Sequence, residues 1–94
     1  MPNERELTVE GSDIVRVAKA LASETRLRIL RLLSVREADI SELAKAIGQS
    51  EANTSSQIKI LENAGLVEAV YRPGRHGVKK VCRLAKSVVR LKIA

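Results

Sequence analysis

Residues that build disulfides, metal centres and catalytic sites are scarce in this chain of 94 residues. Cys82 is the single cysteine, so the chain can form neither an internal disulfide nor a zinc knuckle. His76 is the single histidine, and it lies in a glycine-rich segment. Because serine nucleophiles usually depend on a triad histidine, the composition argues against an enzyme.

Long apolar segments are missing as well. No run approaches the roughly 18–20 residues that a membrane helix needs. Residues 1–10 are charged and contain no apolar segment of the signal-peptide kind. With 45% hydrophobic residues, the chain can still bury the core of one small domain. We therefore expect a single cytoplasmic domain, residues 1–94, with no membrane contact.

Acidic residues are absent from the last quarter of the chain. Residues 1–71 carry nine basic and eleven acidic residues, whereas residues 72–94 carry eight basic residues and no acidic one. These eight are Arg72, Arg75, Lys79, Lys80, Arg83, Lys86, Arg90 and Lys92. A segment with many basic residues and no acidic one is typical of proteins that bind a polyanion such as nucleic acid, although it can also be a solvated surface.

Hydrophobic periodicity predicts four helices in a helical core of residues 12–65. The predicted helices cover residues 12–21, 24–33, 40–47 and 50–64. We expect each to begin at a serine N-cap, namely Ser12, Ser23, Ser41 and Ser50. Gly48 and Gly65 follow the third and fourth helices, where a left-handed conformation is favoured. The remaining segment, residues 34–39, is expected to be a loop.

Alternating residues predict a β-hairpin after the helices. Residues 66–72 and 78–84 form its strands around a turn at residues 73–77, so that residues 66–84 make one hairpin. Residues 1–11 are an arm in which residues 7–10 could form a short edge strand. Residues 85–94 are an extension in which residues 88–93 could be a strand or a helix. The fold class is thus mainly α with a small β-hairpin.

Several segments resemble the ArsR family of bacterial and archaeal repressors. They are ALASETRLRILRLL at residues 20–33, ISELAKAIG at 40–48 and SEANTSSQIKILENAGLV at 50–67. The resemblance covers about residues 13–84 and implies a winged helix-turn-helix. It also implies a homodimer that binds imperfect inverted repeats in promoter DNA, with the helix at 50–64 in the major groove and the hairpin, or wing, against phosphates or the minor groove.

The chain departs from the metal-sensing members of this family. Their thiol site would fall in residues 35–42, which contain no cysteine, and their second common site would fall on a C-terminal helix, whereas residues 88–93 contain no metal ligand. We therefore expect no metal ion and no cofactor. Without that long C-terminal helix, we expect the dimer contact in residues 7–10, 12–21 and 88–93.

One face of the helix at 50–64 is expected to touch DNA. Thr54, Ile58 and Leu61 share the core face, so the opposite side is free. On the helix the expected DNA-binding residues are Ser50, Asn53, Ser55, Ser56, Gln57 and Lys59; on the wing they are Arg72, Arg75, His76 and Lys79. Ser50 has the equal alternative of a plain N-cap, and Ser55 and Ser56 that of exposed helix surface. Lys79 and Lys80 should point to opposite faces of their strand.

Alternative functions remain open on the sequence alone. A winged helix can serve as a protein-interaction module of a transcription assembly, but such domains often lack a basic wing. A non-specific nucleic-acid binder is a further alternative. An RNA-binding domain would usually need stacking aromatics, and Tyr71 is the only aromatic residue. Cys82 is expected to be a half-buried core thiol, because a redox switch would require exposure and a low pKa.

Overall fold

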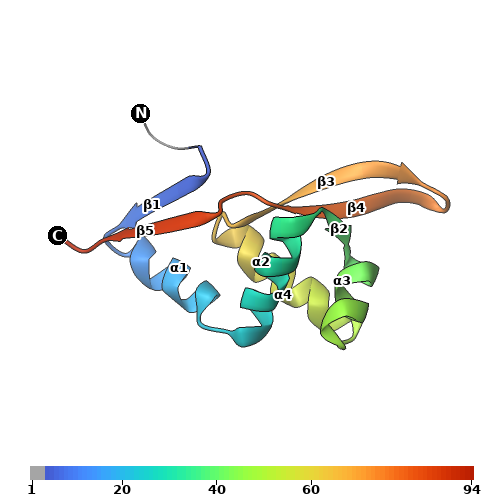
Figure 1. The fold of residues 1–94 in the computed structure, drawn as a ribbon, viewed down its shortest axis with the longest axis horizontal. Coiled ribbons are helices and arrows are strands. Elements are labelled where there is room, and N and C mark those ends of the chain that lie inside the picture. Colours follow the sequence, from blue (N-terminus) through green and yellow to red (C-terminus); the bar gives the residue numbers. More distant parts are fainter. Residues whose placement is uncertain (1–3) are drawn as a thin grey trace.

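Four helices pack beneath a ribbon of short strands in the computed structural model, which describes residues 4–94 (Figure 1). The elements in chain order are β1 (Glu6–Glu10), α1 (Asp13–Leu21), α2 (Glu24–Val35), β2 (Ala38–Asp39), α3 (Ile40–Ile47), α4 (Glu51–Asn63), β3 (Val67–Gly74), β4 (Gly77–Leu84) and β5 (Val88–Lys92). The molecule is elongated, 49 × 28 × 20 Å, because the β3–β4 hairpin projects from one end while β1 and β5 lie at the other (Figure 1). In the described part of the chain, no helix is long and apolar enough to cross a membrane.

The four predicted helices are present, but two of their caps differ from the prediction. The side chains of Ser23 and Ser50 accept hydrogen bonds from the third residue of α2 and α4, as expected. Ser12 forms no such bond. The prediction of Ser41 was also wrong, because Asp39 caps α3 through a capping box. Asp39 Oδ1 accepts from the Glu42 amide at 2.8 Å, and Glu42 Oε1 accepts from the Asp39 amide at 3.1 Å.

The core is aliphatic and lies where α2, α3 and α4 meet the sheet. Its largest fully buried side chains include Ile29, Leu43, Ile58, Leu61 and Leu66. Cys82 lies in the same cluster with no exposed surface, and this burial raises the pKa of its thiol. The expected place in the core is confirmed, although Cys82 is fully rather than half-buried, and its protonated form is favoured over the thiolate that redox chemistry requires.

The wing spans nearly the predicted residues, but its strands are longer than predicted and belong to a sheet of three strands. The strand order is β2–β4–β3, and β2 occupies the segment that was expected to be a loop. Pairing continues to Gly74 opposite Gly77, so only Arg75 and His76 remain in the turn. Pro73 is compatible with this pairing because β3 is an edge strand. The predicted turn at residues 73–77 was therefore too long.

The two chain ends form a second, parallel sheet of β1 and β5. Leu7 pairs with Val89 and Val9 with Leu91, which settles the open assignment of residues 88–93 in favour of a strand. Leu7 and Val89 pack on the core, and Val9 is buried. Val88, Leu91 and Ile93 nevertheless remain exposed, so the dimer contact expected in these segments stays a prediction.

Candidate nucleic-acid interface

The turn between α3 and α4 holds the two helices in a helix-turn-helix. Gly48 closes α3 with φ 68° and ψ 37°, a left-handed conformation that glycine adopts without steric cost. The Gln49 amide then donates to the Ala44 carbonyl at 3.0 Å, and Ser50 begins α4 at once. This tight connection leaves α4 little freedom relative to α3.

The inner side of α4 is fully buried. Thr54, Ile58 and Leu61 each have no exposed surface, which confirms the predicted core face. Thr54 is the one buried polar residue among those described, and its hydroxyl donates to the Ser50 carbonyl at 2.8 Å. Buried residues on successive turns therefore fix α4 against the core. This attachment determines which side of the helix faces solvent.

The outer side of α4 carries most of the predicted contacts. Asn53, Ser55, Ser56 and Lys59 are exposed, and we call these four residues the reading face. The Ser56 hydroxyl donates to the Ala52 carbonyl at 3.2 Å, which satisfies it without a ligand. Gln57 is half-buried, and its side-chain oxygen accepts a hydrogen bond from Arg26 on α2 at 2.7 Å.

The cations of the wing and of β5 are largely paired with carboxylates. Six of the eight basic residues of the C-terminal quarter form ion pairs with acidic residues that precede them in the chain. The pairs are Arg72–Glu37 at 3.0 Å, Lys79–Asp39 at 2.9 Å, Lys80–Glu62 at 2.6 Å, Arg83–Glu68 at 2.7 Å, Arg90–Glu6 at 2.8 Å and Lys92–Glu10 at 3.7 Å. The folded chain therefore spreads less positive charge over this segment than its sequence suggests.

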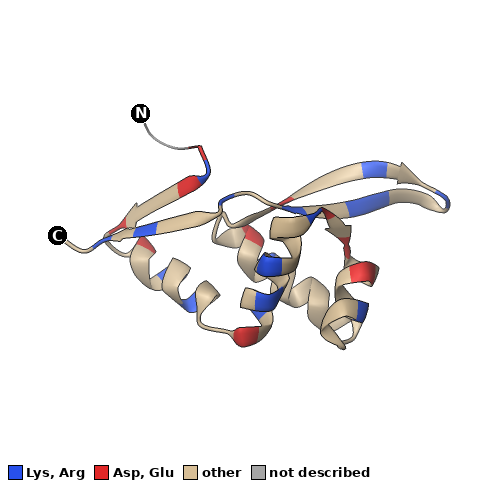
Figure 2. Ribbon diagram, viewed as in Figure 1, with Lys and Arg blue, Asp and Glu red and all other residues tan. Residues whose placement is uncertain are grey.

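Two of these pairs tie the wing to the start of α3. Arg72 of β3 contacts Glu37, and Lys79 of β4 contacts Asp39, the residue that caps α3. The hydrogen bond to Asp39 raises the pKa of Lys79, and the Glu42 amide together with Lys79 lowers the pKa of Asp39. Within residues 4–94 no ion pair involves Arg75, which lies in the turn of the hairpin (Figure 2).

Comparison with known proteins places this arrangement in a family. Residues 23–69, half of the chain, match the family described as bacterial regulatory protein, arsR family. The chain belongs to the ArsR family. The matched residues begin at the N-cap of α2 and end within β3, so they contain the whole helix-turn-helix and the beginning of the wing. The family resemblance inferred from the sequence is confirmed.

Two curated relatives and a solved structure agree with this assignment. HTH-type transcriptional regulator Rv0324 of Mycobacterium tuberculosis is 38% identical over 79 residues, which are 83% of this chain and 33% of the relative. HTH-type transcriptional regulator NmtR of the same organism is 36% identical over 57 residues, which are 61% of this chain and 48% of the relative. The chain thus spans about a third and about half of the length of these two curated relatives.

The solved structure is the homodimeric winged helix-turn-helix DNA-binding domain of Mb0332 from Mycobacterium bovis. It is 37% identical, has a TM-score of 0.69, and the match covers 78% of this chain and 64% of that one. The predicted fold class, mainly α with a β-hairpin wing, is confirmed. The ArsR family consists of regulatory proteins, in agreement with the prediction that the chain is not an enzyme.

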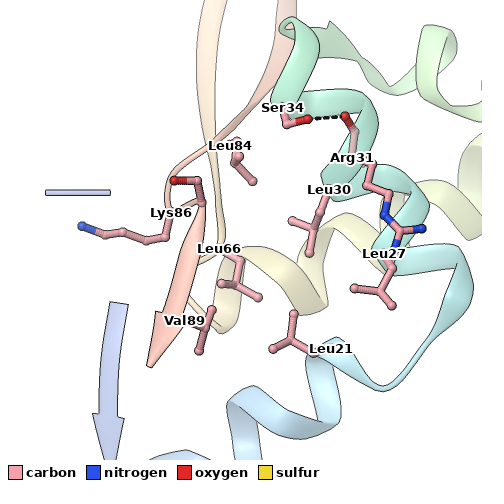
Figure 3. A pocket seen from close by; sticks show the side chains of 10 residues that line it. Leu21, Leu27, Leu30, Arg31, Ser34, Leu66, Leu84, Lys86 and Val89 are labelled. Atoms are coloured by element: carbon pink, nitrogen blue, oxygen red, sulfur yellow. Dashed lines mark hydrogen bonds between the residues drawn. The ribbon is translucent and has the colours of Figure 1, made fainter. Parts of the chain in front are cut away.

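No metal cluster accompanies the helix-turn-helix in the part of the chain that the structure describes. No three His, Cys, Asp or Glu side chains of residues 4–94 lie close enough to share a metal ion. A groove of about 260 Å³ between α2 and β5 is lined mainly by leucines (Figure 3). Lys86 stands at its edge, and its amine points away from those leucines (Figure 3).

The sequence had no direct indication of two features of this interface. Arg26 had no predicted role, yet it contacts Gln57 of α4. The carboxylates that pair with the wing were counted only within the charge of residues 1–71.

Proposed function

We propose that this chain is the DNA-binding part of a homodimeric transcriptional repressor that reads an inverted repeat in promoter DNA. The observation that carries the proposal is the asymmetry of α4. Three fully buried residues attach it to the core, and its opposite side presents amide, hydroxyl and amine groups to solvent. Such groups match the donors and acceptors of base edges and the phosphates beside them.

Each predicted site residue has a role in this proposal. On α4, base edges or nearby phosphates are contacted by Asn53, Ser55, Ser56 and Gln57, and a phosphate is contacted by Lys59. Ser50 caps α4, and the first amides of the helix add a further phosphate donor. On the wing, Arg75 and His76 reach the minor groove or backbone from the turn, while Arg72 and Lys79 contribute phosphate contacts.

The ion pairs of the wing are compatible with DNA binding. Exposed pairs typically contribute about 0–1 kcal/mol, so a DNA phosphate can replace Glu37 as the partner of Arg72 at little cost. Homodimerisation is supported by the family and by the homodimeric domain from M. bovis. Two linked reading helices also gain avidity that one small module lacks.

A selection of binding sites from random duplex DNA tests the proposal. We expect a two-fold symmetric motif whose half-sites lie about 10 base pairs apart, together with affinity that falls steeply with salt. Lys59→Ala should weaken binding to every selected site to the same degree, whereas the exposed Lys45→Ala on α3 is the matched control. Equal affinity for all duplexes, or stronger binding to RNA, would contradict the proposal.

A second function is favoured by one specific observation. Because acids neutralise Arg72, Lys79 and Lys80, this surface could instead serve protein contacts within a transcription assembly. Under that alternative the chain binds no duplex in the selection and the wing residues have no influence on salt dependence. The two functions are therefore separated by the same experiment.

A further inference from the structure

Arg26 lies at the start of α2 and joins three elements of the fold. Its guanidinium donates to the Ala20 carbonyl at 2.6 Å, to the Lys19 carbonyl at 2.9 Å and to Gln57 Oε1 on α4 at 2.7 Å. The two carbonyls belong to the last turn of α1, and the Lys19 carbonyl also accepts from the Ala22 amide at 3.2 Å. Arg26 is half-buried in this position and is fixed by three acceptors at once.

A chain of side-chain amides continues from Arg26 along α4. Gln57 Nε2 donates to Asn53 Oδ1 at 3.4 Å, and Asn53 Nδ2 donates to Gln49 Oε1. Gln49 Nε2 then reaches Thr25 Oγ1 at 3.4 Å, which returns the chain to α2. Two of the predicted base-reading residues, Asn53 and Gln57, thus belong to one hydrogen-bonded network that begins at a cation.

The direction of this network follows from the chemistry of arginine. A guanidinium has donors but no acceptor, so the group of Gln57 that faces Arg26 must be its oxygen. The side-chain NH2 group of Gln57 consequently faces Asn53, which must present its own oxygen. The side-chain NH2 group of Asn53 then faces Gln49. Replacing Arg26 by a group that can also accept a hydrogen bond would allow the whole series of amides to reverse.

We propose that Arg26 is the positioning residue that sets the base specificity of α4, by fixing the side-chain amides of Gln57 and Asn53 in one orientation. The proposal rests on the proposed function of α4 as a DNA-reading helix. Arg26 itself need not touch DNA, because its contacts lie within the protein. Groups held in place before binding lose less conformational entropy when they meet their target.

The fixed orientation specifies which base edges each amide can recognise. Gln57 has its oxygen engaged by a charged donor and retains one N–H, so it favours an acceptor such as N7 or O6 of guanine, N7 of adenine or O4 of thymine. Asn53 retains one N–H and one oxygen lone pair, so it can still pair with adenine at two points. The two amides therefore read different base edges rather than duplicating each other.

The test compares the selected duplex with a set of its single base-pair variants, using the full chain and its Arg26→Gln variant. The wild type should prefer its selected bases about tenfold at the positions beneath Asn53 and Gln57. Arg26→Gln should reduce that preference to about threefold or less while leaving the salt slope and the preference at other positions unchanged. Gln57→Ala should affect the same positions, and adding it to Arg26→Gln should cause little further loss.

Matched variants show whether Arg26 acts by positioning Gln57 and Asn53, by its charge or by stabilising the fold. Arg31→Gln removes a charge from the exposed side of the same helix and should leave base preference intact. If Arg26 instead contacts phosphate, Arg26→Gln weakens all duplexes uniformly and lowers the salt slope by about one unit, which would overturn the proposal. Unchanged base preference in a folded Arg26→Gln variant would overturn it as well.

Gln57→Glu keeps an acceptor for Arg26 and tests the orientation even if variants at Arg26 do not fold. A carboxylate has no donor, so the preference at the Gln57 position should change to a base pair that presents an amino group, such as that of cytosine. An unchanged preference in this variant would contradict the proposed orientation. Failure of the wild type to select any duplex sequence would instead contradict the proposed function of the chain.

Discussion

The reading helix α4 and the wing hairpin hold their polar side chains by different means. In α4 the backbone is fixed by three fully buried residues, and the outer polar groups either face solvent or join the amide network of Arg26. In the wing, most of the basic residues are held by carboxylates of other elements, while the strands themselves are exposed from Tyr71 to Lys79. Packing therefore fixes the orientation of α4, whereas ion pairs hold the basic side chains of the wing, whose backbone is fixed by strand pairing.

This difference corresponds to the two kinds of contact that a DNA-binding protein makes, namely with base edges and with phosphates. Base readout requires donors and acceptors at fixed positions, which a packed helix provides. Phosphate contact requires charge that can adjust to the backbone, and exposed ion pairs exchange partners at low cost. Perturbing α4 should thus change stability and specificity, whereas perturbing the wing should change affinity and its salt dependence.

The largest expected effect comes from removing the packing of α4. Leu61→Ala should lower the free energy of unfolding by about 2–5 kcal/mol, because the side chain is fully buried and the site cannot collapse completely. Thermal or urea unfolding measures this loss. Lys59→Ala, two residues earlier on the exposed side of the same helix, should change stability by no more than about 0.5 kcal/mol. Equal losses in both variants would contradict the assigned core face.

A smaller effect is expected at Asp39, where the two regions meet. Asp39→Ala should cost about 1 kcal/mol because it removes the cap of α3, whereas Ser41→Ala should cost little. If Ser41→Ala proves to be the costlier substitution in urea unfolding, the assignment of the cap is wrong.

The lowered pKa of Asp39 gives this site a pH dependence. Its folded-state pKa lies below the ordinary value of 3.8, so its stabilisation is present above that value and is lost as the pH falls through the folded-state pKa. The stability advantage of the wild type over Asp39→Asn should therefore shrink in acid, below about pH 4. Urea unfolding of both proteins at neutral and acidic pH measures it, and a difference that grows in acid would contradict the proposed linkage.

At the tip of the wing we expect an effect on binding without one on stability. Arg75→Ala should lower affinity for all duplexes alike and reduce the slope of log affinity against log salt by about one unit. Fluorescence anisotropy at several salt concentrations measures both quantities. His76→Ala, at the neighbouring turn position, should leave the slope nearly unchanged near neutral pH. A change in base preference in Arg75→Ala would assign the tip a direct role in base readout.

Local patterns in the sequence were sufficient for α4 but not for the wing. The spacing of Thr54, Ile58 and Leu61 predicts a buried face, and Gly48 with Ser50 predicts the turn and the start of α4, because both signals act within a few residues. Asp39 was missed as a cap because an adjacent serine offered an equally plausible one. The ion pairs join residues that are distant along the chain, such as Lys80 with Glu62 and Arg72 with Glu37, so that charge counts by segment could not reveal them.

The same limitation applies to β2 and to the pairing of the chain ends. Ala38 and Asp39 form a strand only because β4 lies beside them, and two residues carry no alternating pattern. β1 was recognisable as a short alternation and β5 had no clean period, and the pairing of the two depends on how α1 and β4 position the two ends. Tertiary context, rather than local propensity, decides such elements.

The smallest expected effect concerns Glu37, which pairs with Arg72 of the wing. Glu37→Gln releases Arg72 from an exposed ion pair, so stability should change by less than about 1 kcal/mol. Duplex affinity should rise modestly and its salt slope should steepen, because Arg72 is then available to phosphate and a repelling charge is gone. Glu10→Gln removes the same charge and a similar pair with Lys92 at the opposite end of the molecule, which makes it the matched control. Equal gains in both variants would show that net charge alone is responsible, whereas a larger gain for Glu37→Gln would show that the pairing with Arg72 limits the contact of the wing with DNA.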